Sequence, residues 1–221
     1  NYHALPSLLP QAFRPFLGGL IDPGLAFFTC PSQTNPRGAV IALHGHGGNP
    51  KLWLHCWRSF AEEQNCLVLC PSFGFGNWEH QRSVATIGRW RERIGAEFSL
   101  EWVLLAGISQ GGCGVTRGGA ALAEQFDGLI FLSPTLEPAV LASREFVRGW
   151  RGRPVVVCYG GRDHNVTPAS VAAGIAVMKE IGVVVTEQYH PEGDHFLFFD
   201  QTSRLLNRIA RWWNHYRRDT A

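Results

Sequence analysis

Short runs of aliphatic and β-branched residues alternate along this chain with longer segments whose apolar residues recur at helical spacing. Buried parallel strands joined by crossover helices produce this alternation, because such strands are covered on both faces. We therefore expect an α/β fold with a mostly parallel central sheet and helices on both faces. The expected strands are Leu25–Cys30, Ala39–His44, Cys66–Cys70, Trp102–Ile108, Gly128–Ser133, Val155–Tyr159 and Val183–Tyr189, and helices are expected near 50–64, 83–97, 110–125 and 168–181.

In two of the helical segments, the spacing of apolar residues predicts which face of the helix is buried. In the segment after Arg82 and in the C-terminal part of the chain, apolar residues recur at helical spacing while arginines occupy the other faces. Such stripes fit helices that cover a sheet. A basic, tryptophan-rich helix could instead lie on a membrane surface, which is the less favoured alternative for the C-terminal segment. The stripes consist of Ile87, Trp90, Ile94 and Phe98 in the first segment and Leu205, Ile209, Trp212 and Tyr216 in the second.

The length of the chain indicates one domain. A chain of 221 residues, 45% of them hydrophobic, can bury one sizeable core, and no repeat or linker divides it. We expect residues 1–221 to form a single domain. The only insertion-like stretch lies between Pro134 and Pro154, with a short helix expected around residues 138–147. That stretch is too short for a large cap, so an open site is expected.

Charge and hydropathy argue against several kinds of partner. The formal net charge is +2, and the Lys and Arg residues are scattered, so a nucleic-acid partner is not expected. No apolar run reaches the roughly 20 residues that a membrane-spanning helix needs. The first ten residues lack the charged start and apolar stretch of a signal peptide, although the chain begins with Asn. We therefore expect a cytoplasmic protein, and the sequence does not indicate its oligomeric state.

The cysteines favour free thiols over a disulfide framework. Cys66, Cys70 and Cys158 lie within or beside aliphatic runs, where a buried thiol is the ordinary case. No pair has the C-x-x-C spacing of a zinc site or of a thioredoxin-like motif. The pairing of Cys30 and Cys56 stays open.

The motif Gly-Ile-Ser-Gln-Gly at residues 107–111 is the strongest candidate for chemistry. An aliphatic run precedes it and a helical segment follows, and a strand, a sharp turn and a helix together lift a serine hydroxyl above a sheet. The flanking glycines suit a turn in which side chains would clash. The alternative is that these glycines serve only the turn and that Ser109 is a helix cap. We expect Ser109 to be a nucleophile.

A serine nucleophile needs a base and an acid that orients the base. Asp163 follows the expected strand ending at Tyr159, and His195 follows the next one, so both should lie at the carboxyl edge of the sheet. The order Ser109, Asp163, His195 is that of α/β-hydrolases rather than of chymotrypsin-like or subtilisin-like enzymes. Glu137 is the rival acid and is less favoured, and Asp194 should cap or orient the loop.

An oxyanion formed during acyl transfer needs backbone N–H groups fixed in advance. We expect these donors to be the amides of His46, which follows an apolar strand, and of Gln110, which follows the nucleophile. His44 and His46 also form an H-x-H pair that suggests a zinc site. The Asp and His that usually continue such a motif are replaced by residues 47–49, which read Gly-Gly-Asn. We therefore expect no metal.

Four motifs together resemble a known group of enzymes. The combination spans roughly residues 39–200 and resembles the α/β-hydrolase superfamily. Within it, the chain is similar to the small phospholipase/carboxylesterase family and to esterase and polyhydroxybutyrate-depolymerase-like relatives. The motifs are Leu-His-Gly-His-Gly-Gly at 43–48, Gly-Ile-Ser-Gln-Gly-Gly at 107–112, Gly160-x-x-Asp163-x-x-Val166-x-Pro168 and Gly193-Asp194-His195.

The resemblance implies an α/β-hydrolase fold without a large cap and hydrolysis of carboxylic esters or thioesters without a cofactor. Two features depart from the family pattern. His46 stands where members often carry an apolar or small residue, and the aromatic loop at residues 71–78 has no clear counterpart. Because that loop follows a strand end, we expect Phe73 and Trp78, together with Phe196 beside the base, to border the substrate pocket.

The leading hypothesis is a serine carboxylesterase that acts on a small-molecule ester through an acyl-enzyme on Ser109. One alternative is a peptidase like the catalytic domain of prolyl-oligopeptidase-like proteins, which carry similar elbows, although the chain has no propeller to gate the site. Another is a non-catalytic binding protein with a hydrolase fold. Such proteins usually lack a member of the triad, and this chain has a candidate for each.

Overall fold

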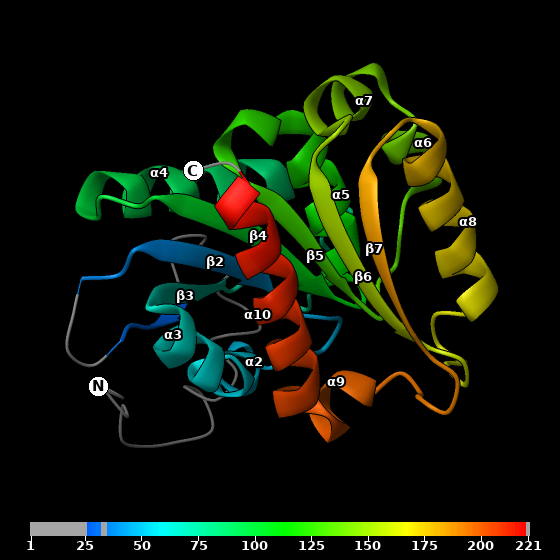
Figure 1. Ribbon diagram of the computed structural model, residues 1–221, viewed down its shortest axis with the longest axis horizontal. Helices are drawn as coiled ribbons and strands as arrows, with labels where there is room; N and C mark the ends of the chain where they lie inside the picture. The colour runs from blue at the N-terminus through cyan, green and yellow to red at the C-terminus, as the bar shows by residue number, and fades with distance from the viewer. Residues whose placement is uncertain (1–25, 32–34, 220–221) are drawn as a thin grey trace.

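The computed structural model describes residues 26–31 and 35–219, which are organised around a seven-stranded sheet (Figure 1). The strand order is β1-β3-β2-β4-β5-β6-β7. β1 runs antiparallel to β3, and every other neighbouring pair is parallel. The strands are β1 (Ala26–Thr29), β2 (Gly38–Leu43), β3 (Cys66–Pro71), β4 (Trp102–Ile108), β5 (Gly128–Leu132), β6 (Pro154–Gly160) and β7 (Val184–His190).

Helices cover both faces of this sheet. The core on one face is closed by α2, α3, α9 and α10, and the core on the other face by α4, α5, α7 and α8. Figure 1 shows α10 crossing in front of the strands. The helices are α2 (Pro50–Cys56), α3 (Arg58–Gln64), α4 (Arg82–Glu97), α5 (Gly111–Ala121), η1 (Ala123–Gln125), α6 (Pro138–Leu141), α7 (Arg144–Trp150), α8 (Pro168–Glu180), α9 (Leu197–Asp200) and α10 (Thr202–Asp219).

The two cores explain why the central strands are aliphatic throughout. In β2, the side chains of Ala39, Ile41 and Leu43 enter one core, and those of Val40 and Ala42 enter the other. Successive side chains of a strand point to opposite faces, so a strand between two helical layers has no solvated side. The mostly parallel α/β fold expected from the sequence is confirmed.

The strands lie where they were predicted, with ends that shift by at most one residue. Leu25, the expected first residue of β1, lies outside the described residues. The helices differ more. The helix expected over 50–64 is interrupted at Trp57, and the one expected over 110–125 ends at Ala121. The short helix expected around 138–147 is two helices, because the Ser143 hydroxyl caps a new one by accepting from the Phe146 N–H.

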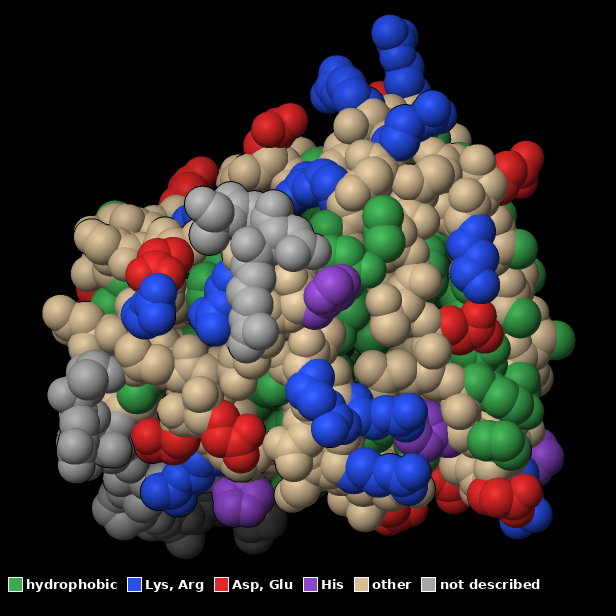
Figure 2. Space-filling model, in the orientation of Figure 1, with side chains coloured by type: hydrophobic (Ala, Val, Ile, Leu, Met, Phe, Trp, Pro, Cys, Tyr) green, Lys and Arg blue, Asp and Glu red, His purple; other side chains and the backbone are tan. Residues whose placement is uncertain are grey.

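The C-terminal helix α10 packs on the sheet, as favoured from its sequence. Trp212 and Trp213 are buried in the core with Leu205. Figure 2 shows basic side chains on the outer face of this helix, where Arg204 and Arg211 are exposed. Because its tryptophans fill the protein core, α10 does not offer them to a membrane surface. Within the described part of the chain, no helix is long and apolar enough to cross a bilayer.

The cysteines lie as free thiols in this fold. Cys66, Cys70 and Cys158 are buried in strands, as expected, whereas Cys30 and Cys56 are half-buried. Burial raises the pKa of the Cys158 thiol to about 12, because a thiolate loses its hydration there. Such a group stays protonated at neutral pH and acts as a small apolar side chain.

Candidate active site

Ser109 occupies the sharp turn between β4 and α5. Its φ is 53°, which lies in the left-handed region. This backbone conformation is energetically unfavourable for any residue other than glycine. The turn is tight because its glycines touch neighbouring backbone. A Cβ on Gly107 would lie 2.4 Å from the Gly111 oxygen, and a Cβ on Gly111 would lie 2.5 Å from the Leu43 oxygen. The glycines are therefore required sterically, and the turn holds the Ser109 side chain beyond the end of the strand.

Ser109, His195 and Asp163 are linked by hydrogen bonds, as their order in the sequence predicts. The Ser109 Oγ and the His195 Nε2 lie 3.0 Å apart, and the His195 Nδ1 and the Asp163 Oδ2 lie 2.8 Å apart. A carboxylate can only accept, so Nδ1 carries the ring proton and Nε2 accepts from the serine hydroxyl. This tautomer is the one in which the imidazole can take the serine proton.

The Asp163 carboxylate is held from both sides. Its Oδ1 accepts hydrogen bonds from the N–H groups of Asn165 at 2.9 Å and Val166 at 2.8 Å, while Oδ2 accepts from His195. The residue is only 2% exposed. Hydrogen bonds that satisfy a buried carboxylate offset the cost of removing it from water. Asp163 is therefore a fixed, ordered partner for the imidazole.

The loops that carry the acid and the base are joined to each other by their backbones. The Gly161 N–H donates to the His190 oxygen, and the Arg162 N–H donates to the Gly193 oxygen, each at 2.8 Å. A Cβ on Gly160 would lie 2.2 Å from that same Gly193 oxygen. These contacts hold the loop after β6 against the loop after β7, so Asp163 and His195 keep their relative positions.

The other acidic residues near the site have different partners. Both carboxylate oxygens of Glu137 accept from the Arg117 guanidinium, at 2.8 Å and 2.6 Å. The Asp194 Oδ1 accepts from the Phe196 N–H at 2.8 Å and so caps the turn after His195. These contacts leave Asp163 as the carboxylate that binds the imidazole.

The two predicted oxyanion donors belong to segments that lie beside Ser109. A Cβ on Gly45, the residue before His46, would lie 3.2 Å from the Ser109 Cβ, so this loop runs directly against the nucleophile. Gln110 follows Ser109 and is the N-cap of α5, where the helix dipole favours negative charge. Within residues 26–31 and 35–219, no backbone carbonyl accepts from the N–H of His46 or Gln110. Neither amide is therefore committed to a backbone carbonyl in this part of the chain, and their role as oxyanion donors stays a prediction.

His44 and His46 differ in environment. His44 is 1% exposed, and burial lowers the pKa of its imidazole to about 4. The exposed His46 ring pairs through Nδ1 with the Asn77 Oδ1 at 3.1 Å. In the described residues, no three His, Cys, Asp or Glu side chains come together as a metal-binding group.

The aromatic residues expected to contact substrate divide into two groups. Trp78 is fully buried and donates from its Nε1 to the His44 oxygen at 2.8 Å, and the ring of Phe73 stacks on it at 4.6 Å. Both rings lie beneath the surface and offer little exposed area at the site, and their contact with substrate stays a prediction. Phe196, by contrast, is 57% exposed, and its ring packs edge-on against His195 at 5.7 Å.

Two exposed rings near the site were not singled out by the sequence. Phe75 is 50% exposed and lies 6.4 Å from the ring of His46, and Phe199 is 37% exposed and lies 6.5 Å from the ring of Phe196. A glycine on either side of Phe75 is the signal that places it at the tip of a turn. Exposed aromatic rings therefore lie beside His46 and beside the Phe196 ring that contacts His195.

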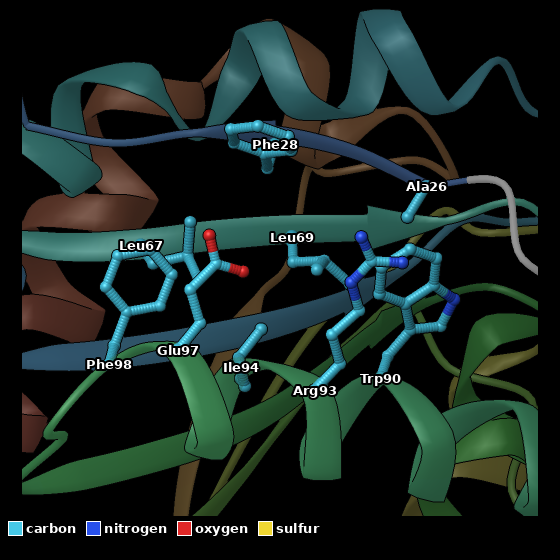
Figure 3. Close-up of a pocket in the computed structure, with 9 residues that line it drawn as sticks. All are labelled: Ala26, Phe28, Leu67, Leu69, Trp90, Arg93, Ile94, Glu97 and Phe98. Atoms are coloured by element: carbon cyan, nitrogen blue, oxygen red, sulfur yellow. The ribbon is translucent and has the colours of Figure 1, made fainter.

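A separate hollow of about 320 Å³ lies between β1, β3 and α4 (Figure 3). Arg93 and Glu97 are its polar side chains, and Figure 3 shows them on the helix side of the hollow. None of the candidate catalytic residues lines it. The lining residues are Ala26, Phe28, Leu67, Leu69, Trp90, Arg93, Ile94, Glu97 and Phe98.

Solved structures of esterases and of a peptidase share this fold. Zea mays acyl-protein thioesterase 2 has a TM-score of 0.65 at 16% identity, over 86% of this chain and 99% of its own. A phospholipase/carboxylesterase from Dyadobacter fermentans has a TM-score of 0.63 at 19% identity, over 84% of this chain and 95% of its own. An acylaminoacyl peptidase from Pyrococcus horikoshii has a TM-score of 0.62 at 12% identity, over 85% of this chain but 37% of its own.

These similarities show that the chain has the α/β-hydrolase fold expected from its motifs. Sequence identities this low establish similarity of the fold and nothing about activity. The sequence matches no family model and no curated protein.

Proposed function

We propose that the protein is a serine hydrolase that cleaves carboxylic esters or thioesters through an acyl-enzyme on Ser109. The observation that carries this proposal is the pair of hydrogen bonds that connects the Ser109 Oγ through His195 to Asp163. A nucleophile, a base in the correct tautomer and an acid that orients the base are the parts that acyl transfer to serine requires.

In the first step, the Ser109 Oγ attacks the ester carbonyl carbon while its proton passes to the His195 Nε2. The carbonyl electron pair moves to the oxygen, and the N–H groups of His46 and Gln110 stabilise the resulting oxyanion. Asp163 stabilises the imidazolium that forms. When the carbonyl reforms, the bond to the alcohol or thiol breaks, and the leaving group takes the proton from His195.

In the second step, a water molecule replaces the leaving group. His195 takes a proton from this water as its oxygen attacks the acyl carbonyl, and the same two amides hold the oxyanion. Collapse breaks the bond to the Ser109 Oγ, which recovers its proton from His195. The acid leaves and the resting enzyme is restored.

The exposed rings beside the site support an apolar acyl or alcohol group in the substrate. Phe196 offers exposed apolar surface against His195, with Phe199 beside it, and Phe75 offers such surface beside His46. Apolar surface of this kind lines most small-molecule sites. The likeness to a peptidase structure keeps peptide amides as the second candidate. Parallel rates on a short p-nitrophenyl ester and on a peptide anilide separate the two.

The test is the turnover of a p-nitrophenyl ester by the variant Ser109→Ala. We expect turnover to fall to background while the circular dichroism spectrum is unchanged. The matched control is Ser203→Ala, because Ser203 is exposed on α10. Near-wild-type turnover by Ser109→Ala would sink the proposal, and a folded wild-type protein that neither turns over esters nor reacts with a fluorophosphonate would favour a non-catalytic binding protein.

A further inference from the structure

His44 is a buried residue that the proposed reaction does not use, and both nitrogens of its ring are engaged. It directly follows β2. Its Nε2 lies 3.3 Å from the backbone N of Phe73, and its Nδ1 lies 2.9 Å from the oxygen of Gly45. The Phe73 N–H can only donate, so Nε2 is the acceptor. Nδ1 therefore carries the proton and donates it to the Gly45 carbonyl.

The neutral ring that these bonds require is the form that burial favours. His44 is buried among residues of the loop at 72–78, and its pKa is lowered to about 4 because the charged imidazolium would lose its hydration. The indole of Trp78 lies edge-on to the ring at 5.5 Å and donates to the His44 oxygen. The ring is thus fixed in place and in one tautomer.

The Gly45 carbonyl is held from three sides. It accepts from the His44 Nδ1–H and from the Gly48 N–H, the latter at 3.0 Å. Gly76 packs against it so closely that a Cβ there would lie 2.5 Å from the Gly45 oxygen. A carbonyl held by two donors and a backbone contact has little freedom to rotate.

The orientation of that carbonyl also sets the direction of the next amide. Gly45 C=O and His46 N–H belong to one planar trans peptide, so they point in opposite directions. With the oxygen turned toward the buried imidazole, the N–H is turned away from it. Gly45 itself lies against Ser109. The contacts that hold the oxygen inward therefore hold the N–H of His46 on the side of the peptide that faces away from the buried imidazole.

We propose that His44 is a positioning residue, which fixes the peptide between Gly45 and His46 so that the His46 amide can stabilise the oxyanion. This inference rests on the proposed serine hydrolase function. His44 touches neither substrate nor the Ser109 hydroxyl, and it acts through the Gly45 carbonyl. Its effect is therefore on the transition state, in which the oxyanion exists, and not on the bound ester.

The test compares His44→Leu with His44→Gln on a p-nitrophenyl ester. Leucine has a similar size and no hydrogen-bonding group, whereas glutamine has both a donor and an acceptor. Since the loss of one oxyanion donor costs about 100-fold or more in kcat, we expect a loss of about that size in His44→Leu. We expect KM to change by less than about threefold, since ground-state binding is untouched. Glutamine should restore part of kcat, which a role in packing alone would not produce.

A second pair of variants disturbs the same peptide from its other side. Gly76→Ala places a Cβ against the Gly45 oxygen, so we expect a loss of kcat with little change in KM. Gly152→Ala is the matched control, because Gly152 also has a positive φ, of 74°, but no atom lies within 4 Å of the added Cβ. That variant should lose some stability and keep its kcat.

The outcomes separate the inference from the proposed function. A wild-type protein without esterase activity or fluorophosphonate labelling defeats the proposed function and the inference with it. If the wild type is active and the folded His44→Leu variant keeps a kcat within about threefold of the wild-type value, the inference alone is defeated. If His44→Leu does not fold, the comparison of Gly76→Ala with Gly152→Ala decides, and equal kcat values in those two overturn the inference.

Discussion

Asp163, on the floor of the site, is 2% exposed and accepts three hydrogen bonds, whereas the ring of Phe196, on its rim, is 57% exposed. The floor comprises Ser109, Asp163, His195 and the loop at residues 44–48, and the rim comprises Phe75, Phe196 and Phe199. Floor residues are fixed by hydrogen bonds and by backbone contacts that only glycine permits. Rim residues can vary with little cost to the fold, so under the proposed function the reaction depends on the floor and the choice of substrate on the rim.

The largest effect should come from the acid of the floor. Asp163→Asn keeps the size of the side chain, but an amide can donate to His195 and so favours the wrong tautomer. We expect kcat to fall by about four orders of magnitude, as for the corresponding change in serine proteases. Glu137→Gln is the matched control, and its activity should stay near that of the wild type because Glu137 binds Arg117 instead. A large loss in the control with none in Asp163→Asn would reverse the assignment.

Removal of a buried support should cost stability. Trp78→Ala leaves a cavity beneath the floor and removes the donor to the His44 oxygen, so we expect the free energy of unfolding to fall by about 3–5 kcal/mol. Urea titration measures this change. The rim variant Phe196→Ala should change the same free energy by no more than about 0.5 kcal/mol. Equal losses in the two variants would remove the distinction between floor and rim.

Stability should also fall with acid because of His44. Its pKa is about 4 in the fold and near 6.5 in the unfolded chain, so between these values the unfolded state binds more protons. The contribution of neutral His44 to the free energy of unfolding is complete above pH 6.5 and is lost as the pH falls toward 4. At pH 5 we expect a loss on the order of 2 kcal/mol relative to pH 7.5. Urea titrations at both pH values should show a smaller difference for His44→Gln, and an equal difference would contradict this role of His44.

The smallest effect should appear in substrate preference. Phe196→Ala removes apolar surface beside Ser109, so we expect KM for a long-chain ester to rise by about fivefold to tenfold while kcat for an acetyl ester is unchanged. The control is Phe28→Ala, because Phe28 is also highly exposed but lies on β1, at the edge of the sheet. If both variants behave alike, Phe196 is not part of a substrate-contacting rim.

The strands and the candidate catalytic groups could be predicted because their signals are local and ordered. A buried parallel strand needs a continuous aliphatic run, and the loops that follow such strands meet at one edge of the sheet. A recognisable strand precedes each of the three candidate catalytic residues, and its end predicts where the residue lies. These residues are Ser109, Asp163 and His195. The antiparallel pairing of β1 carries no such signal, because a short strand reads the same in either direction.

The aromatic loop shows where the sequence is insufficient. Phe73, Phe75 and Trp78 are all aromatic residues in one glycine-rich segment, and nothing local says which of them turns inward. Contacts with distant residues decide this. Trp78 turns inward because its Nε1 reaches the His44 oxygen, and Phe75 is left at the tip of the turn. Helix ends depend in the same way on caps such as Ser143, which are weaker signals than an apolar stripe.

The most direct test of the central claim is to find where a fluorophosphonate attaches. After incubation of the folded protein, intact mass and peptide mapping give the number of adducts and the modified residue. We expect one adduct per chain, on Ser109, and its rate of formation should fall sharply in His195→Ala because the base is lost. A folded protein that forms no adduct, or that carries it on another residue, would contradict the claim that Ser109 is the nucleophile.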